Sequence, residues 1–154
     1  MDCGSKMEVF RTYEERDFQR LCEMVLGLYE EDPPGQEMNE EKIRKTLDQL
    51  QKFPEKWTIH IIDVDSKAVG YCIAVTFWSN EYSGDVVMFD ELYIKKSFRG
   101  EWLGKKFLKY LMEEVYITAV GFEIRTTKNN VRAQRLYRSL GFHENTDGSI
   151  FLEK

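Results

Sequence analysis

The 154-residue sequence is poor in the residues that build disulfide frameworks and metal centres. Its three cysteines, Cys3, Cys22 and Cys72, are scattered and form no CxxC pair. Its two histidines, His60 and His143, stand in no spacing typical of zinc ligands. These patterns argue against a disulfide-rich secreted protein and against a metal site, and we expect a protein of the reducing cytoplasm.

Long apolar runs are also missing. No stretch approaches the roughly 18 apolar residues that cross a bilayer. The first ten residues, MDCGSKMEVF, contain no apolar segment typical of a signal peptide. We therefore expect no membrane partner. We expect residues 1–6 to be disordered or left over from cloning, with Met7 as the natural start.

The charge is unevenly distributed along a chain of ordinary globular composition, with 42% apolar and 32% charged residues. The net charge is −5, yet residues 95–109 carry six basic side chains against one acid, and residues 125–138 carry five against none. These two basic segments favour an anionic ligand, and the acidic remainder a cationic one, with solvated helix faces as the alternative. Nucleic acid is disfavoured, because the overall charge is negative and no recognition motif is present.

Hydrophobic spacing predicts the secondary structure. Short apolar or alternating runs predict strands at 9–13, 57–64, 68–78, 86–94, 121–127 and 148–153, and a further strand at 142–145 remains open. Apolar residues three and four apart predict helices at 14–29, from the N-cap Asn39 to before Pro54, at about 103–115 and at 129–140. The order β-α-α-β-β-β-α-β-α-β, with an optional last strand, predicts a single α/β (α+β) domain.

The segment SFRGEWLGKKFL, residues 97–108, connects a predicted strand to a predicted helix. A helix N-terminus presents unpaired N–H groups and partial positive charge, which bind phosphate, and Gly100 and Gly104 allow close approach. The dinucleotide fingerprint GxGxxG fails at Trp102, and the P-loop pattern fails because its glycines are one residue too close and Lys106 replaces Ser or Thr. From this loop alone, a phosphate site and a helix start with incidental glycines both remain open.

A second motif bears on the choice between a phosphate site and a helix start with incidental glycines. Residues 129–144, NNVRAQRLYRSLGFHE, read N-x-x-A-x-x-L-Y-x-x-L-G-F. Together with DELYI (90–94) and the loop about 30 residues upstream, they closely resemble the GNAT superfamily of N-acetyltransferases. The resemblance covers the element order of essentially the whole chain, and LYEEDPP and FWSNEY also resemble a bacterial branch of small members. It implies one N-acetyltransferase domain at 1–154, with a mixed sheet of six to seven strands flanked by about four helices.

The resemblance also implies acetyl-CoA as cofactor. The family's loop, [QR]-x-x-G-x-[GA], falls on residues 99–104, with Trp102 in place of its first glycine. We expect Trp102 to have a negative, helix-like φ and a ring that points away from the phosphates. The implied cofactor residues lie on the strand, in the loop and in the second motif: Leu92, Tyr93, Ile94, Arg99, Gly100, Glu101, Trp102, Leu103, Gly104, Lys105, Asn130, Ala133 and Tyr137.

Acetyl transfer to an amine needs a base, a donor to the carbonyl oxygen and a proton for the leaving thiolate. The resemblance implies Tyr137 as the general acid, and a core tyrosine is the alternative reading. Asp90 and Glu91 are the candidate bases. Strand alternation puts Asp90 on the face of Leu92 and so favours Asp90, unless a local bulge reverses the parity. At least one of the two is expected to be an ion-pair partner instead.

Acidic and aromatic residues mark the expected acceptor side. Glu30, Glu31 and Asp32 end the first helix, in the region that covers the acceptor mouth in this family, and we expect Glu81 to lie near them. Carboxylates attract a cationic amine and aromatic rings add cation–π contacts, whereas solvated or core roles are the alternatives. The expected acceptor residues are Tyr29, Glu30, Glu31, Trp78, Glu81 and Tyr82.

The sequence therefore predicts an acetyl-CoA-dependent N-acetyltransferase that acts on a primary amine by direct attack in a ternary complex. A small cationic amine is the leading acceptor, and a protein lysine or N-terminus is the first alternative. A non-catalytic acyl-CoA-binding protein is the second alternative, suggested by Trp102. Because family members are often dimers, a homodimer is an open expectation.

Overall fold

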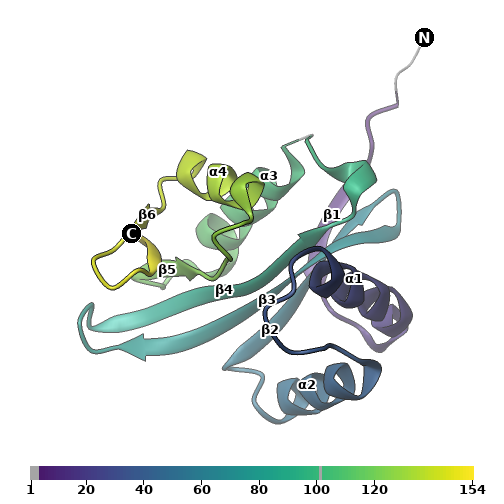
Figure 1. The fold of residues 1–154 in the computed structure, drawn as a ribbon, viewed down its shortest axis with the longest axis horizontal. Helices are drawn as coiled ribbons and strands as arrows, with labels where there is room; N and C mark the ends of the chain where they lie inside the picture. Colours follow the sequence, from purple (N-terminus) through teal and green to yellow (C-terminus); the bar gives the residue numbers. More distant parts are fainter. Residues whose placement is uncertain (1–3, 101) are drawn as a thin grey trace.

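The computed structural model describes residues 4–100 and 102–154, and it contains one seven-stranded sheet with helices on both faces (Figure 1). The strand order is β1-β2-β3-β4-β5-β7-β6. Neighbouring strands are antiparallel except β4 and β5, which are parallel. The strands are β1 (Glu8–Thr12), β2 (Trp57–Val64), β3 (Lys67–Ser79), β4 (Gly84–Ile94), β5 (Gly121–Ile124), β6 (His143–Glu144) and β7 (Ile150–Glu153).

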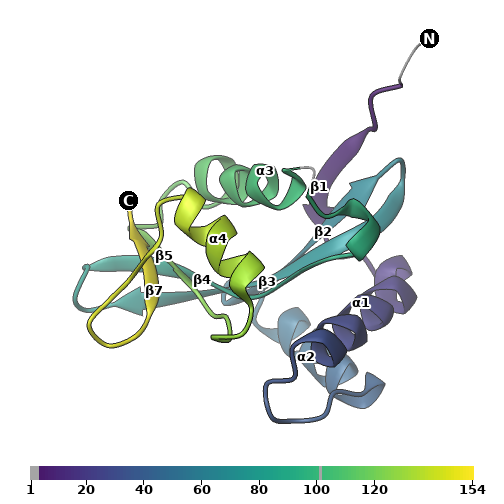
Figure 2. The same cartoon turned by 45° about the horizontal axis from the view of Figure 1, so that its top comes forward.

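Four α-helices cover the sheet, α1 and α2 on one face and α3 and α4 on the other, as the turned view shows (Figure 2). They are α1 (Phe18–Glu31), α2 (Glu40–Lys52), α3 (Leu103–Tyr110) and α4 (Val131–Ser139). Short 3₁₀ turns lie at Glu15–Asp17 and Lys96–Phe98, and a π-helical turn, Leu111–Val115, extends α3. Within the described residues, no helix is both long and apolar enough to cross a membrane.

The predicted fold class and element order are confirmed, including the short strand β6. Asn39 caps α2, because its side-chain oxygen accepts from the Lys42 N–H at 2.9 Å. The main difference is that β5 ends at Ile124 rather than at residue 127. This early end follows from the loss of its partner, since β4 and β5 pair only as far as Phe89 and Ile124.

The core lies in two clusters, one on each face of the sheet. Ile61 and Ile62 are consecutive and fully buried, and they belong to different clusters because successive strand residues face opposite ways. Phe107 of α3 packs in the cluster of Ile62, and Leu21 of α1 in that of Ile61. Each such burial contributes about 1.5–3 kcal/mol. Burial on both faces explains why β2 reads as a nearly continuous apolar run.

A β-bulge and an open edge of β4 shape the functional site. The register with β3 shifts between Ile73 and Ala74, so that Asp90 is an extra residue in a β-bulge. Beyond the bulge, the Lys95 N–H donates to the Val69 carbonyl on β3. Backbone groups alternate in direction along a strand, so those of Leu92 and Ile94 face away from β3. The sheet edge at Leu92 and Ile94 is therefore open on the side where β5 has separated.

Candidate active site

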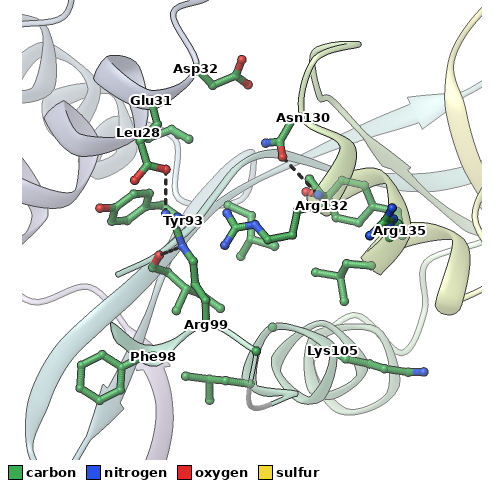
Figure 3. A pocket seen from close by; sticks show the side chains of 18 of the residues that line it. Leu28, Glu31, Asp32, Tyr93, Phe98, Arg99, Lys105, Asn130, Arg132 and Arg135 are labelled. Atoms are coloured by element: carbon green, nitrogen blue, oxygen red, sulfur yellow. Dashed lines mark hydrogen bonds and ion pairs between the residues drawn. The ribbon is translucent and has the colours of Figure 1, made fainter. Parts of the chain in front are cut away.

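A cleft of about 550 Å³ lies beside this open edge (Figure 3). Its walls are the end of β4, the start of α3, one face of α4 and the last turn of α1. All but one of the predicted cofactor residues line it: Leu92, Tyr93, Ile94, Arg99, Gly100, Trp102, Leu103, Gly104, Lys105, Asn130, Ala133 and Tyr137. Glu101, the remaining one, lies outside the described residues.

The start of α3 supplies backbone donors to the cleft. The first N–H groups of a helix have no partner within it, and in α3 these belong to Leu103, Gly104 and Lys105. Among the described residues, no side chain caps this end of the helix. A Cβ atom at Gly104 would lie 3.2 Å from Leu136 and 3.3 Å from Ile94. Glycine therefore lets the donors of α3 sit close to both α4 and β4.

Three cations line the cleft without a carboxylate partner among the described residues: Lys105, Arg132 and Arg135. Arg132 extends from α4 into the cleft (Figure 3). Partial burial and the nearby charge of Arg99 both lower the pKa of Arg132. A negatively charged ligand in the cleft would relieve this repulsion, so the arrangement suits an anion.

Arg99 does not point at the start of α3. Its Nε donates to the Ile94 carbonyl at 2.6 Å, its Nη2 donates to Glu31 Oε2 at 2.8 Å, and its guanidinium lies over the Tyr93 ring (Figure 3). On the other wall, Thr127 donates to Asp32 at 2.7 Å. The last turn of α1 is thus tied to both sides of the cleft. Glu31 and Asp32, expected at the acceptor mouth, line the same cleft as the expected cofactor residues.

The expectation of a negative φ at Trp102 is wrong. Its φ is +64°, in the left-handed region, because α3 begins only at Leu103 and the chain is still turning at residue 102. This conformation favours glycine, which gives a physical reason for the glycine in the family's loop. The indole is 73% exposed at the rim of the cleft, and Lys105 Nζ lies 5.2 Å from its ring centroid.

The bulge interrupts the strand alternation on which the preference for Asp90 rested. Phe89 pairs with Ala74 and Glu91 with Ile73, so Phe89 and Glu91 lie on opposite faces. Asp90 forms an ion pair with Arg125 at 3.6 Å. Neither carboxylate belongs to the cleft lining.

Glu91 is a mostly buried carboxylate held by two tyrosines. The Tyr71 hydroxyl donates to Oε1 at 2.7 Å, and the Tyr29 hydroxyl donates to Oε2 at 3.0 Å. Burial raises the pKa of Glu91, although the two hydrogen bonds oppose this shift. A carboxylate with a raised pKa is suited to accept and release a proton near neutral pH.

Tyr137 lies on the α4 wall of the cleft and is 5% exposed. Burial raises its pKa well above the ordinary value, with a further contribution from Cys72. Within the part of the chain that the structure describes, no hydrogen bond engages its hydroxyl. Asn130, expected to contact the cofactor, caps α4 with an oxygen that accepts from the Ala133 N–H at 3.2 Å. Its side-chain amide nitrogen donates to no described residue.

A second hollow, of about 400 Å³, lies on the other side of the last turn of α1. Its lining includes the predicted residues Tyr29 and Glu30, together with Glu37 and Met38 of the segment that leads to α2. Tyr29 of this lining also donates to Glu91, which itself lies outside the lining.

The expectation that Glu81 lies near Glu30 is wrong. Trp78, Glu81 and Tyr82 sit at the tip of the β3–β4 hairpin, which extends away from α1 (Figure 1). Gly84 at this tip is seven residues from Glu91, or about 23 Å along an extended strand. Tyr82 instead stacks on Phe151 of β7, with ring centroids 4.7 Å apart.

Three residues of the site, Tyr71, Arg132 and Arg135, were not predicted individually from the sequence. Tyr71 stands inside an apolar strand and looks like a core residue, and only the fold brings it to Glu91. Arg132 and Arg135 were counted only within a basic segment. Their spacing of three residues in a predicted helix, inside the second motif, was a usable signal, because residues three apart share a helix face.

The family model of the acetyltransferase (GNAT) domain matches residues 55–144, more than half of the chain. The chain belongs to the GNAT acetyltransferase family. As a member of this family it is an acetyl-CoA-dependent acetyltransferase, which confirms the predicted family and enzyme class.

Solved structures of GNAT acetyltransferases share the fold of this one over nearly their whole length. The Salmonella typhimurium protein yncA, solved with its cofactor acetyl-CoA, is 16% identical with a TM-score of 0.73, covering 95% of this chain and 93% of that chain. The aminoglycoside N-acetyltransferase AAC(6')-Iy in complex with CoA is 16% identical with a TM-score of 0.77, covering 94% and 93%. The ribosomal-protein-alanine N-acetyltransferase from Brucella melitensis is 18% identical with a TM-score of 0.70, covering 95% and 98%.

Proposed function

We propose that this GNAT acetyltransferase transfers the acetyl group to a small cationic primary amine, by direct attack within a ternary complex. One observation carries the proposal. The last turn of α1 separates a cation-lined cleft from an acidic hollow, and Tyr29 of that turn joins the hollow to the buried Glu91. We assign the cleft to the acetyl donor and the hollow to the acceptor, with Glu91, bonded to Tyr29, as the candidate base.

The residues of the cleft fit acetyl-CoA, which supplies the acetyl group as a thioester. The N–H groups at the start of α3 suit its pyrophosphate, and Lys105, Arg132 and Arg135 suit its negative charge. The open edge of β4 at Leu92 suits the amide groups of the pantetheine arm, which can pair with it as an added strand. The Ile94 carbonyl is already engaged by Arg99.

Glu91 is proposed as the base, with Tyr29 as the group that relays the proton. The ammonium group first loses one proton to solvent, which frees the lone pair of the nitrogen. As the nitrogen bonds to the acetyl carbon, its second proton passes to Tyr29 Oη, and the Tyr29 proton passes to Glu91 Oε2, 3.0 Å away. The raised pKa of Glu91 matches this task. Asp90, paired with Arg125, is given no direct role.

Two further groups stabilise the acetyl carbonyl oxygen and protonate the leaving sulfur. The Leu92 N–H, on the open edge, donates to the acetyl carbonyl oxygen as charge develops there. The C–S bond breaks as the C–N bond forms, and the sulfur takes the hydroxyl proton of Tyr137. Glu91 then loses its proton to solvent and Tyr137 regains one, so that the products are the N-acetylated amine and CoA.

The acceptor class is argued from the acidic hollow. Its volume of about 400 Å³ suits a small molecule, and Glu30 and Glu37 in its lining attract a positive charge. Tyr29 in the same lining holds the relay hydroxyl. These features favour a polyamine-like or aminoglycoside-like amine over a protein acceptor.

The test is thiol release from acetyl-CoA across a panel of cationic amines, neutral amines and peptides. We expect the cationic amines to be the best acceptors, and the double variant Glu30→Gln with Glu37→Gln to raise their KM about tenfold or more. Glu113→Gln, which removes an exposed carboxylate outside both lined sites, is the matched control and should leave KM unchanged. Turnover only with peptides would overturn the acceptor class, and no turnover with any acceptor would overturn the transfer itself.

A further inference from the structure

Trp102 combines two unfavourable features. At 73% exposure, its indole is the most solvent-exposed large apolar side chain among the described residues. Its φ of +64° is a conformation that costs a non-glycine residue about 1–3 kcal/mol. Among the described residues, the indole stacks on no other aromatic ring, and its one cation–π contact is with Lys105, whose Nζ lies 5.2 Å from the centroid of the indole ring. The chain's own packing therefore does not explain a tryptophan here.

The position of Trp102 points to a ligand. It directly precedes the unpaired N–H groups of α3, and its carbonyl accepts the first bond of that helix, from the Lys106 N–H at 2.9 Å. It lines the cleft together with Lys105 and Arg135. Figure 3 shows Lys105 and Arg135 projecting from α3 and α4 on the same side of the cleft, opposite Arg99 and Tyr93. The rim thus offers a flat ring beside the cation Lys105, with a second cation, Arg135, in the same lining.

We propose that the Trp102 indole is the platform on which the adenine of CoA stacks, and that this contact makes the enzyme prefer acetyl-CoA to acetyl donors that lack the nucleotide. This inference rests on the placement of acetyl-CoA proposed above. The adenosine is joined directly to the pyrophosphate, so a pyrophosphate on the first N–H groups of α3 brings the base within reach of the preceding residue. Stacking of a base on an aromatic side chain contributes about 1–3 kcal/mol, comparable to the backbone strain.

The test compares Trp102→Leu with Trp102→Phe. Both keep a Cβ atom and hence the same backbone strain, but only phenylalanine keeps a flat ring. Calorimetric titration with acetyl-CoA should show about tenfold weaker binding for Trp102→Leu and a change below threefold for Trp102→Phe. S-acetyl-4′-phosphopantetheine lacks the adenosine, its 3′-phosphate and one phosphate of the pyrophosphate, and wild type and both variants should bind this donor with equal affinity. Trp78→Leu, which removes an exposed tryptophan outside the cleft, is the control and should match wild type.

Each contrary outcome has a definite meaning. Equal losses for both donors would show that Trp102 shapes the loop rather than binding adenine, and unchanged acetyl-CoA binding by Trp102→Leu would exclude any contact. Either result overturns the inference while leaving the proposed function intact. If wild type binds acetyl-CoA no more tightly than acetyl-phosphopantetheine, the inference also fails. If wild type binds neither donor at millimolar concentration, the placement of acetyl-CoA fails first.

Discussion

Arg99 and Glu31 form an ion pair across the cleft between the last turn of α1 and the loop before α3, with Arg99 Nη2 2.8 Å from Glu31 Oε2. The two side chains are 68 positions apart in the chain and only 16% and 29% exposed. Arg99 also donates to the Ile94 carbonyl. Arg99 is therefore engaged in holding α1, β4 and the loop before α3 together.

We expect Arg99→Ala to lower the free energy of unfolding by about 1–3 kcal/mol, because it removes charged hydrogen bonds in a largely buried place. Arg20→Ala, which removes an exposed pair with Glu23, should cost less than about 0.5 kcal/mol. Urea denaturation measures both.

Arg132→Gln should weaken acetyl-CoA binding more than Arg99→Ala does, since Arg132 has no carboxylate partner among the described residues. The reverse order of affinities would show that Arg99 leaves Glu31 to bind phosphate.

Tyr137→Phe tests the proposed acid. Its hydroxyl bonds no described residue, so the melting temperature and the affinity for acetyl-CoA should change little, whereas kcat should fall about 100-fold. Tyr116→Phe is the matched control with the opposite result. The Tyr116 hydroxyl lies 2.7 Å from Nε2 of His60, whose pKa burial lowers to about 4. Its loss should lower stability and leave kcat unchanged. A kcat of Tyr137→Phe within twofold of wild type, with chemistry rate-limiting, would remove Tyr137 from the mechanism.

The proposed base predicts a pH profile. Because burial raises the pKa of Glu91, kcat/KM should rise with pH through an ionisation above that of an ordinary glutamate. Tyr71→Phe removes a hydrogen bond that stabilises the ionised form, so this rise should move to higher pH. Glu91→Gln should abolish it, and Asp90→Asn should leave it in place. Loss of the rise in Asp90→Asn alone would reassign the base to Asp90.

The raised pKa of Glu91 also makes the stability of the protein depend on pH. This dependence can be measured as the melting temperatures of wild type and Glu91→Gln across a range of pH. A raised pKa in the folded state means that folding favours the protonated form, so the stability contributed by Glu91 is present below its unfolded pKa of about 4.3 and is lost as pH rises through the folded value. We expect equal melting temperatures near pH 4 and a higher one for Glu91→Gln at pH 7–8. A constant difference across this range would contradict the raised pKa.

Trp102→Gly should stabilise the protein while weakening cofactor binding. Glycine adopts a φ of +64° without steric cost, so the free energy of unfolding should rise by about 1 kcal/mol, or roughly 2–4 °C in melting temperature. Trp102→Ala keeps the Cβ atom and should show no such gain. If both variants melt at the wild-type temperature, the left-handed conformation carries no strain.

The local features of the site were readable from the sequence. Hydrophobic spacing predicted the element order, because each helix or strand is specified by neighbouring residues. The loop at 99–104 and the second motif at 129–144 indicated the family and the cleft residues. Even the departure at Trp102 was visible, although its left-handed φ was not, since that depends on where α3 begins.

What only the tertiary structure decided lies between distant segments. The bulge at Asp90 arises from the pairing of β4 with β3, and it interrupts the strand alternation on which the preference for Asp90 rested. Tyr29 donates a hydrogen bond to Glu91, 62 positions away in the chain. Arg99 donates to Glu31 of α1 instead of projecting freely from its own loop. The sequence determined which side chains carry charge and which segments form each element. The packing of α1 against the end of β4 determined which charges are neutralised and which remain for substrates, because that packing is set by the whole core rather than by any local pattern.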